Sequence, residues 1–267
     1  MSTPGESYTT RPFLKIRRAY VHNFEASRRK HFIHGLVEID VTELRQAIRR
    51  EEAAGKDISF TAVVMHAVAR AVDEDRIMHA YRRRNQLILF DDVDVNTQIE
   101  VMSDGQKIVK PLLVRAANRK SIDELTKEIR AGQAPDPDAE RRYRATVALL
   151  SIPRPLRSLA WRAAMSSPTL FKRMGGTVGL SSVGMFGAGG GWGIPIAPPT
   201  LMITIGGIAT KPRYVNGSVE PRELLDITIS VDHTVVDGAT AARFTRRLRE
   251  LLEHPVMLPR SAARPDA

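Results

Sequence analysis

One segment of the chain holds residue types that could perform acid–base chemistry. It runs from Ile227 to Phe244 and reads ITISVDHTVVDGATAARF. An apolar alternating stretch leads into His233, Asp237 and Gly238 follow after three more residues, and a helix-like pattern begins directly behind them. A histidine at the end of a strand, beside a glycine turn, suits a general base because the imidazole titrates near neutral pH. A lone histidine near a turn is more often structural, so it is the complete strand–H-x-x-x-D-G–helix context that favours catalysis.

The hydrophobic pattern predicts the elements that would position this segment. Apolar residues at helical spacing predict a core helix over 60–72, and a final helix is predicted over 239–253. Capping-box patterns at Asp40/Glu43 and at Ser121/Glu124 predict two further helix starts. Strands are predicted over residues 32–41, 87–90, 93–101, 108–114, 177–182, 201–208 and 225–231. Helices and strands that mix without strict alternation predict an α/β (α+β) fold, with a mixed sheet and flanking helices.

Composition narrows the class of protein. The chain has 267 residues and no cysteine, and 43% of its residues are hydrophobic, which is typical of a globular domain. Without cysteine there is no disulfide, no thiolate metal ligand and no cysteine nucleophile, and a reducing, cytoplasmic location is expected. No apolar run approaches the ~18 residues of a membrane-spanning helix. The stretch from Met1 to Arg11 has no signal-peptide apolar region.

The charge balance predicts an anionic ligand. Lys and Arg number 40 against 30 Asp and Glu, which gives a net charge of +10. Such a balance attracts nucleic acid, acidic lipid or phosphorylated small molecules. Aromatic residues make up only 6% and do not interleave with the basic clusters, which disfavours nucleic-acid binding. A coenzyme with several phosphates would benefit from the same charge.

Further segments extend the pattern around His233. In chain order they are Arg28–Phe32 (RRKHF), Ile39–Thr42 (IDVT), Ala117–Ser121 (ANRKS), Gly176–Gly187 (GTVGLSSVGMFG) and Pro198-Pro199 before an apolar strand. Together with the H-x-x-x-D-G context, they resemble the catalytic domain of the dihydrolipoamide acyltransferases of 2-oxoacid dehydrogenase complexes. These acyltransferases belong to the same superfamily as chloramphenicol acetyltransferase. The resemblance covers about residues 12–258 and implies the CoA-dependent acyltransferase fold.

The resemblance implies a role for each matching residue. His233 would be the general base for a thiol or hydroxyl acceptor, and Ser181 would donate a hydrogen bond to the tetrahedral oxyanion. Asp237 would be architectural and would pair with Arg28, with Gly238 supporting the same turn. The acyl donor would be coenzyme A as a thioester, although no individual CoA contacts are identified. In this family a homotrimer builds the site, with His233 facing Ser181 of the next chain.

Several alternatives use the same residues. Ser181, His233 and Asp237 could form a hydrolase triad, but the G-x-S-x-G elbow is missing around Ser181. A metal site on His233 and Asp237, or on His31 and His34, would lack a third ligand. The glycine-rich run 184–193 matches no phosphate-binding loop and is expected to be a loop beside the site. Water as the acyl acceptor, which would make the protein a hydrolase, and a non-catalytic scaffold that keeps the fold both remain open.

The chain also departs from the family pattern. Residues 13–258 are expected to form one catalytic domain between flexible tails at 1–12 and 259–267, without lipoyl or partner-binding domains. Residues 131–175 are expected to be an inserted helical segment, either packing on the trimer or offering a surface to a lipid-like acyl group or a membrane. The end of the chain lacks an apolar anchor, so a trimer and no large cage is expected. A lipoylated partner is possible as the source or acceptor of the acyl group.

Overall fold

A computed structural model of the chain describes residues 9–10, 27–28, 30–103, 106–134, 166–183, 189–196 and 199–254, together with isolated positions at 141, 156, 159 and 163. The predictions for residues 1–8, for the Asp104-Gly105 turn, for most of the 131–175 segment, for Gly184–Ala188 and for the tail at 259–267 therefore lie outside the described residues. No helix in the described ranges is both long and apolar enough to cross a membrane.

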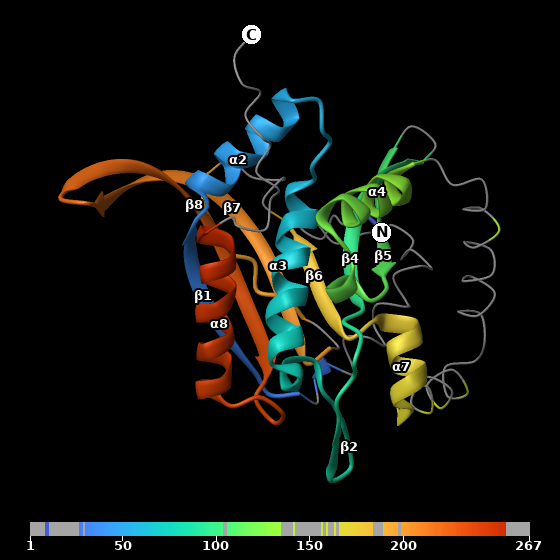
Figure 1. The fold of residues 1–267 in the computed structure, drawn as a ribbon. Coiled ribbons are helices and arrows are strands. Elements are labelled where there is room, and N and C mark those ends of the chain that lie inside the picture. The colour runs from blue at the N-terminus through green and yellow to red at the C-terminus, as the bar shows by residue number, and fades with distance from the viewer. Residues whose placement is uncertain are drawn as a thin grey trace, which may run out of the picture.

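A six-stranded mixed sheet forms the centre of the molecule (Figure 1). In spatial order its strands are β1 (Phe32–Asp40), β8 (Ser218–Asp232), β7 (Leu201–Val215), β6 (Val178–Ser182), β4 (Val95–Ser103) and β5 (Gln106–Val114). The pairs β4–β6 and β6–β7 are parallel, and the other pairs are antiparallel. The mixed sheet predicted from the sequence is confirmed.

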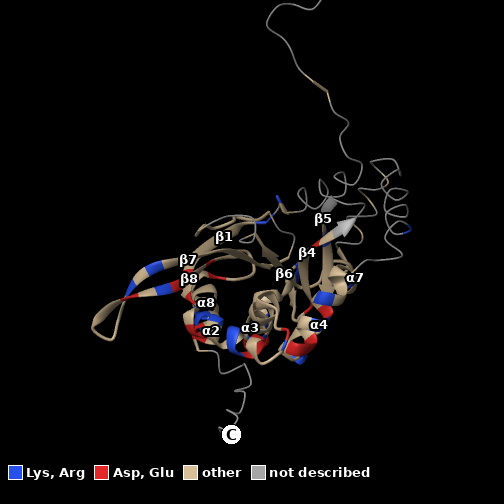
Figure 2. Cartoon of the chain, turned by 90° about the horizontal axis from the view of Figure 1, so that it is seen from above, with Lys and Arg blue, Asp and Glu red and all other residues tan. Residues whose placement is uncertain are grey.

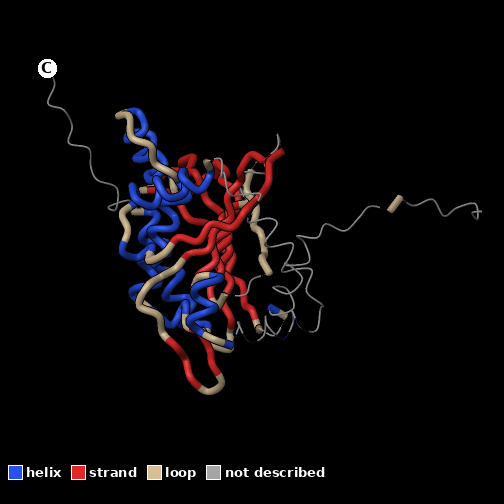
Figure 3. The backbone as a smooth tube through the Cα atoms, turned by 90° about the vertical axis from the view of Figure 1, so that its right-hand side faces the viewer, coloured by secondary structure: helices blue, strands red, loops and turns tan. Residues whose placement is uncertain are grey.

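Helices cover one face of this sheet (Figure 3). They are α2 (Thr42–Ala53), α3 (Phe60–Glu74), α4 (Ile122–Gln133) and α8 (Gly238–Glu253), and α7 (Pro168–Gly175) lies beyond the β4–β5 end. The 3₁₀ turns η1 (Arg76–His79) and η2 (Ala117–Arg119) connect these elements. Helix α3 is buried along most of its length, as its apolar periodicity predicts, and its residues join those of the inner sheet face in one core.

Two capping predictions had different outcomes. The Ser121/Glu124 capping box is confirmed at the start of α4, where the serine accepts from the Glu124 N–H and the glutamate accepts from the Ser121 N–H. The Asp40/Glu43 box is wrong, because α2 has Val41 at its N-cap position. The Asp40 carboxylate instead accepts from the Thr42 N–H and hydroxyl and pairs with Arg222 at 2.7 Å, so it serves the junction between β1 and β8.

Two hairpins differ from the predicted strand ends. A small one, β2 (Tyr81–Arg83) with β3 (Gln86–Ile88), stands in place of the single strand predicted over 87–90. The other joins β7 and β8 through the Asn216-Gly217 turn and continues their pairing well beyond the sheet (Figure 1). Basic and acidic residues are interspersed on this projecting part and on α2 and α4 (Figure 2), so the surplus of positive charge is not gathered on those elements.

Candidate active site

Ser181 lies near the C-terminal end of β6, on the sheet face opposite the helices. Val178 and Leu180 point into the core under the helices, so the alternation of the strand places Gly179 and Ser181 on the opposite face. A Cβ at Gly179 would come 2.2 Å from the Met202 sulfur, so the glycine makes room for that side chain. The Ser181 side chain is half-buried and available on this face.

A row of hydroxyl groups crosses the sheet beside Ser181. Ser181 pairs with Thr204 of β7, and Thr204 pairs with Thr228 of β8. Both threonines are buried, and their hydroxyl oxygens have no hydrogen-bond partner among the described residues. A buried hydroxyl without a partner costs about 1–3 kcal/mol. The row was not predicted, although a threonine between two isoleucines in each of the two apolar strands is the signal that could have indicated it.

The end of the glycine-rich run packs onto this same face. The Asp226 carboxylate, which is buried, accepts from the Gly191 N–H at 2.5 Å, and the Gly207 N–H donates to the Gly191 carbonyl at 3.1 Å. A Cβ at Gly206 would lie 2.1 Å from that carbonyl oxygen, so the backbones approach as closely as only glycine permits. Gly193 then sits against Thr204. The expected loop beside the site is therefore held in place by Asp226.

His233 follows directly after the last residue of β8. Its N–H donates to the His31 carbonyl at 2.7 Å, which continues the pairing of β8 with the chain leading into β1. The N–H groups of Val235 and Val236 donate to the Asp232 carbonyl and close a tight turn. The His233 side chain is exposed in the single chain. A fixed backbone and an accessible imidazole are what a general base requires.

Asp237 has a structural role that can be stated from its contacts. It is the N-cap of α8, and its carboxylate accepts from the Thr240 N–H at 2.7 Å. That hydrogen bond is the main reason why the pKa of Asp237 is lowered from its ordinary value. Gly238 begins the helix immediately behind it. No ion pair between Asp237 and Arg28, which is exposed, is present among the described residues, so the predicted pair is not formed within one chain.

A different ion pair supports the His233 turn. The Lys30 ammonium lies 3.6 Å from the Asp232 carboxylate, which is buried and also accepts from the Thr234 N–H at 3.1 Å. Burial lowers the pKa of Lys30, and the attraction of Asp232 acts in the opposite direction. The resemblance described above implies this role for Arg28 and Asp237. The signal that was missed is the acidic residue directly before His233, opposite the basic cluster before β1.

One chain does not bring Ser181 and His233 together. Thr228 lies in the same row of the sheet as Ser181, two strands away, and His233 is five residues further along the chain. At the ordinary rise of a strand, this places the two side chains about 16 Å apart along the strand direction alone. A site that uses both side chains therefore requires a second copy of the chain.

His79 is the most strongly perturbed histidine in the described part of the chain. It is buried, with Nε2 3.1 Å from the Phe90 carbonyl and Nδ1 2.9 Å from the Thr177 hydroxyl. A carbonyl only accepts, so Nε2 carries the proton and Nδ1 accepts from Thr177. Burial lowers the pKa of His79 to about 4. His79 is therefore neutral, and its hydrogen bond with Thr177 connects η1 to the start of β6.

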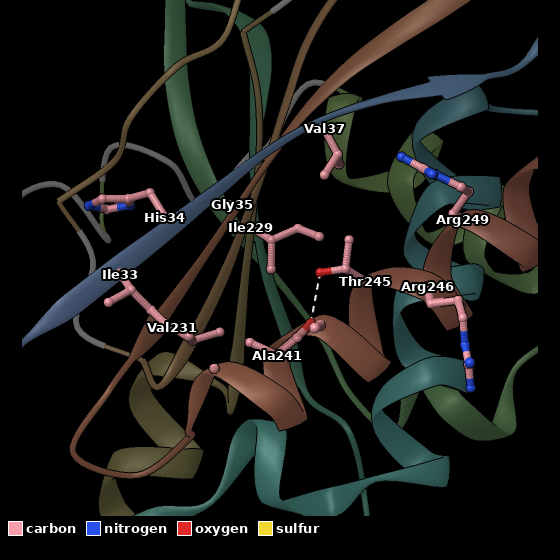
Figure 4. A pocket seen from close by; sticks show the side chains of 12 residues that line it. Ile33, His34, Gly35, Val37, Ile229, Val231, Ala241, Thr245, Arg246 and Arg249 are labelled. Atoms are coloured by element: carbon pink, nitrogen blue, oxygen red, sulfur yellow. Dashed lines mark hydrogen bonds between the residues drawn. The ribbon is translucent and has the colours of Figure 1, made fainter.

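A pocket of about 450 Å³ opens between the free edge of the sheet and α8 (Figure 4). Residues of β1 and β8 form its floor, and the first three turns of α8 form its wall. Neither His233, Ser181 nor Asp237 lines it, whereas Gly238 does. In the described ranges, no three His, Asp or Glu side chains are grouped as metal ligands would be.

Comparison with known proteins agrees with this arrangement. The sequence model of the 2-oxoacid dehydrogenases acyltransferase (catalytic domain) family matches residues 5–134 and 144–259. The chain is 24% identical over 260 residues to the dihydrolipoyllysine-residue acetyltransferase component of the pyruvate dehydrogenase complex of Rickettsia prowazekii, covering 95% of this chain and 56% of that protein. It spans about half the length of the curated relatives it matches.

Solved structures show the same fold. A probable dihydrolipoamide acetyltransferase from Listeria monocytogenes superposes with a TM-score of 0.69 at 19% identity, covering 98% of this chain and 99% of that one. A dihydrolipoamide acetyltransferase of Azotobacter vinelandii gives a TM-score of 0.68 at 22% identity, covering 94% and 93%. That structure belongs to a study of a serine, a histidine and an asparagine in the catalytic mechanism. The predicted fold class is confirmed.

Proposed function

The chain belongs to the acyltransferase (catalytic domain) family of the 2-oxoacid dehydrogenases, and from this we propose that it transfers an acyl group between coenzyme A and a thiol or hydroxyl acceptor. The observation that carries the proposal is the placement of His233. Its backbone is fixed by the His31 carbonyl and by the α8 turn, while its imidazole remains accessible.

The proposed reaction needs one base and one hydrogen-bond donor. The His233 imidazole takes the proton of the acceptor thiol or hydroxyl, and the resulting nucleophile attacks the carbonyl carbon of the thioester. The Ser181 hydroxyl donates to the oxygen that becomes negatively charged. As the tetrahedral intermediate collapses, the bond between the carbonyl carbon and the CoA sulfur breaks. The departing thiolate then recovers the proton from the His233 imidazolium.

The site is proposed to lie between subunits of a homotrimer. The separation of about 16 Å along one sheet supports a site in which His233 of one chain faces Ser181 of another. The hydroxyls of Thr204 and Thr228 continue the same row, but both are buried within the chain, so of this row only Ser181 is available to the neighbour. Asp237 and Gly238 begin the helix behind His233, and Lys30 with Asp232 fixes the turn from the other side.

The relatives indicate the kind of acceptor. The Rickettsia relative is named for a dihydrolipoyllysine residue, so a lipoyl thiol on a partner protein is the proposed natural acceptor. The histidine and asparagine named for the Azotobacter enzyme are four positions apart, which is also the spacing of His233 and Asp237. Aspartate in place of asparagine still caps α8, because either side chain accepts a backbone N–H.

A transfer assay tests the proposal. The full chain is incubated with acetyl-CoA and dihydrolipoamide, and the release of free CoA is followed with and without the acceptor. The His233→Ala variant is expected to lose several orders of magnitude in turnover while its oligomeric state in light scattering is unchanged. His254→Ala, at the exposed opposite end of α8, is the matched control. Undiminished turnover in His233→Ala would remove the assignment, and CoA release without acceptor would show that water is the acceptor.

A further inference from the structure

Asp232 is the last residue of β8, and its polar groups are all engaged around the His233 turn. Its N–H donates to the Thr200 carbonyl at 2.9 Å, and its carbonyl closes the tight turn described above. One oxygen of its carboxylate accepts from the Thr234 N–H at 3.1 Å and from the Thr234 hydroxyl at 2.5 Å. Asp232 therefore holds a polar atom of each of the two peptide groups that flank His233.

Lys30 holds the other oxygen of the same carboxylate. Its ammonium lies 3.6 Å from that oxygen, and the side chains of Lys30 and Asp232 are 25% and 6% exposed. Water and salt screen a pair in such a place less than a pair on the surface. The Lys30 N–H donates to the Ser27 carbonyl at 3.0 Å, and the next residue, His31, supplies the carbonyl that accepts from the His233 N–H. Two adjacent residues before β1 thus hold the turn on this side.

Thr200 holds the turn on the other side. Its carbonyl accepts from the Asp232 N–H, and its hydroxyl donates to the Ala80 carbonyl at 2.7 Å. Both Thr200 and Ala80 are buried, and Ala80 directly follows η1. The segment that carries His233 is therefore connected through Asp232 to the chain before β1 and to the end of η1.

The His233 imidazole itself is held only through its backbone. No described residue makes a hydrogen bond with the imidazole, and the side chain is exposed. Its direction therefore depends on the conformation of the two peptide groups on either side of it. A displacement of about 1 Å at a reacting group can cost about 100-fold in rate, so the groups that fix this conformation matter to the reaction.

We propose that Asp232 and Lys30 are positioning residues for His233, and that their ion pair keeps the imidazole directed at the acceptor. The cation holds the Asp232 side chain in the one orientation in which it also accepts from Thr234. This inference rests on the proposed acyltransferase function. It assigns the positioning role to a pair other than Arg28 and Asp237, for which the resemblance implies it.

Steady-state kinetics of the full chain with acetyl-CoA and dihydrolipoamide test the pair. Lys30→Met should lower kcat by about tenfold or more while KM for acetyl-CoA changes by less than about twofold, because the pair acts on the base and not on the thioester. Lys30→Arg keeps the charge and should restore kcat to within about threefold of the parent. Asp232→Asn should resemble Lys30→Met. Because both residues act through one contact, the double variant should fall no more than about threefold below the lower single variant.

Arg247→Gln is the matched control. It removes an ion pair of 2.7 Å with Glu74 on the exposed side of α8 and should leave both constants unchanged. Parental kcat in Lys30→Met, a loss confined to KM, or additive losses in the double variant would each overturn the proposal. If Lys30→Met does not assemble in light scattering, Thr234→Val decides, because this side chain is exposed and only its hydroxyl bond to Asp232 is lost. A fall in kcat of about threefold or more then supports the proposal, and parental kcat overturns it.

A second measurement separates this inference from the proposed function. If no acetyl group is transferred at all, the proposed function fails, and NMR relaxation of ¹³C-labelled histidine rings still decides the positioning role. The His233 signal is assigned by its absence in His233→Ala. Greater mobility of this ring in Lys30→Met than in the parent supports the proposal, and equal mobility overturns it.

Discussion

The separation of Ser181 and His233 within one chain leads to a complementation experiment. Ser181→Ala removes the oxyanion donor and is expected to cost about 100-fold in turnover, and His233→Ala removes the base and costs more. If each site combines the histidine of one subunit with the serine of the next, a mixed trimer of the two variants contains some sites with both residues intact. If both residues came from one chain, every site would lack one of them.

The expected recovery follows from random assembly. In an equal mixture, half of the histidines and half of the serines are intact, and neighbouring subunits are drawn independently. About one quarter of all sites then have both, and because homotrimers contain none of them, each mixed trimer has one complete site in three. Captured mixed trimers should therefore recover about a third of the parent's activity per subunit. This exceeds either single variant by more than tenfold, which a CoA-release assay resolves easily.

The assay uses the two variants co-expressed with different affinity tags, so that mixed trimers are purified by tandem capture. The control pairs His233→Ala with the double variant Ser181→Ala/His233→Ala, in which no arrangement restores a complete site. Mixed trimers that stay at the level of the single variants would refute the intersubunit site and the argument from strand geometry.

Two further predictions concern stability. Folding lowers the pKa of His79 from its ordinary value of about 6.5 to about 4. As the pH drops, this histidine therefore becomes protonated in the unfolded chain before it does so in the folded chain. This contribution to folding is complete above about pH 6.5 and is lost toward pH 4, amounting to about 2 kcal/mol between pH 7 and pH 5. The free energy of unfolding in urea is measured at pH 7 and at pH 5. Between these pH values it should fall by about 2 kcal/mol less in His79→Gln than in the parent or in His254→Gln. An equal fall in all three proteins would contradict the prediction. Gly206→Ala should destabilise the fold by about 2 kcal/mol, because its Cβ would lie 2.1 Å from the Gly191 carbonyl oxygen. An unchanged urea midpoint would show that this contact relaxes freely.

The elements around His233 could be predicted because their signals are local. An alternating strand and an amphipathic helix each depend on residues within one or two turns of one another, and α8 and the C-terminal half of β8 lie where the pattern places them. The role of Asp237 as the N-cap of α8 was not predicted. The Asp40/Glu43 capping box failed because Asp40 found partners in Thr42 and, across the sheet, in Arg222. A short motif does not show such competition.

Features that depend on register could not be read from the sequence. Thr204 and Thr228 become neighbours of Ser181 only once three strands are aligned. The Lys30–Asp232 pair joins residues 202 positions apart, and Asp226 meets Gly191 only after β7 has bent at Gly206-Gly207. The pocket is likewise a property of an interface, because it needs small residues on both β1 and α8.

The projecting hairpin of β7 and β8 is a suitable place to attach a spectroscopic label. Tyr214 and Val219 face each other near its tip and are 77% and 68% exposed, so a substitution there disturbs no core packing. The sequence contains no cysteine, and a single Tyr214→Cys variant would therefore carry one maleimide dye or spin label per chain without background. Distances between labels on neighbouring chains would then count the subunits and measure their spacing in solution, before any ligand is known.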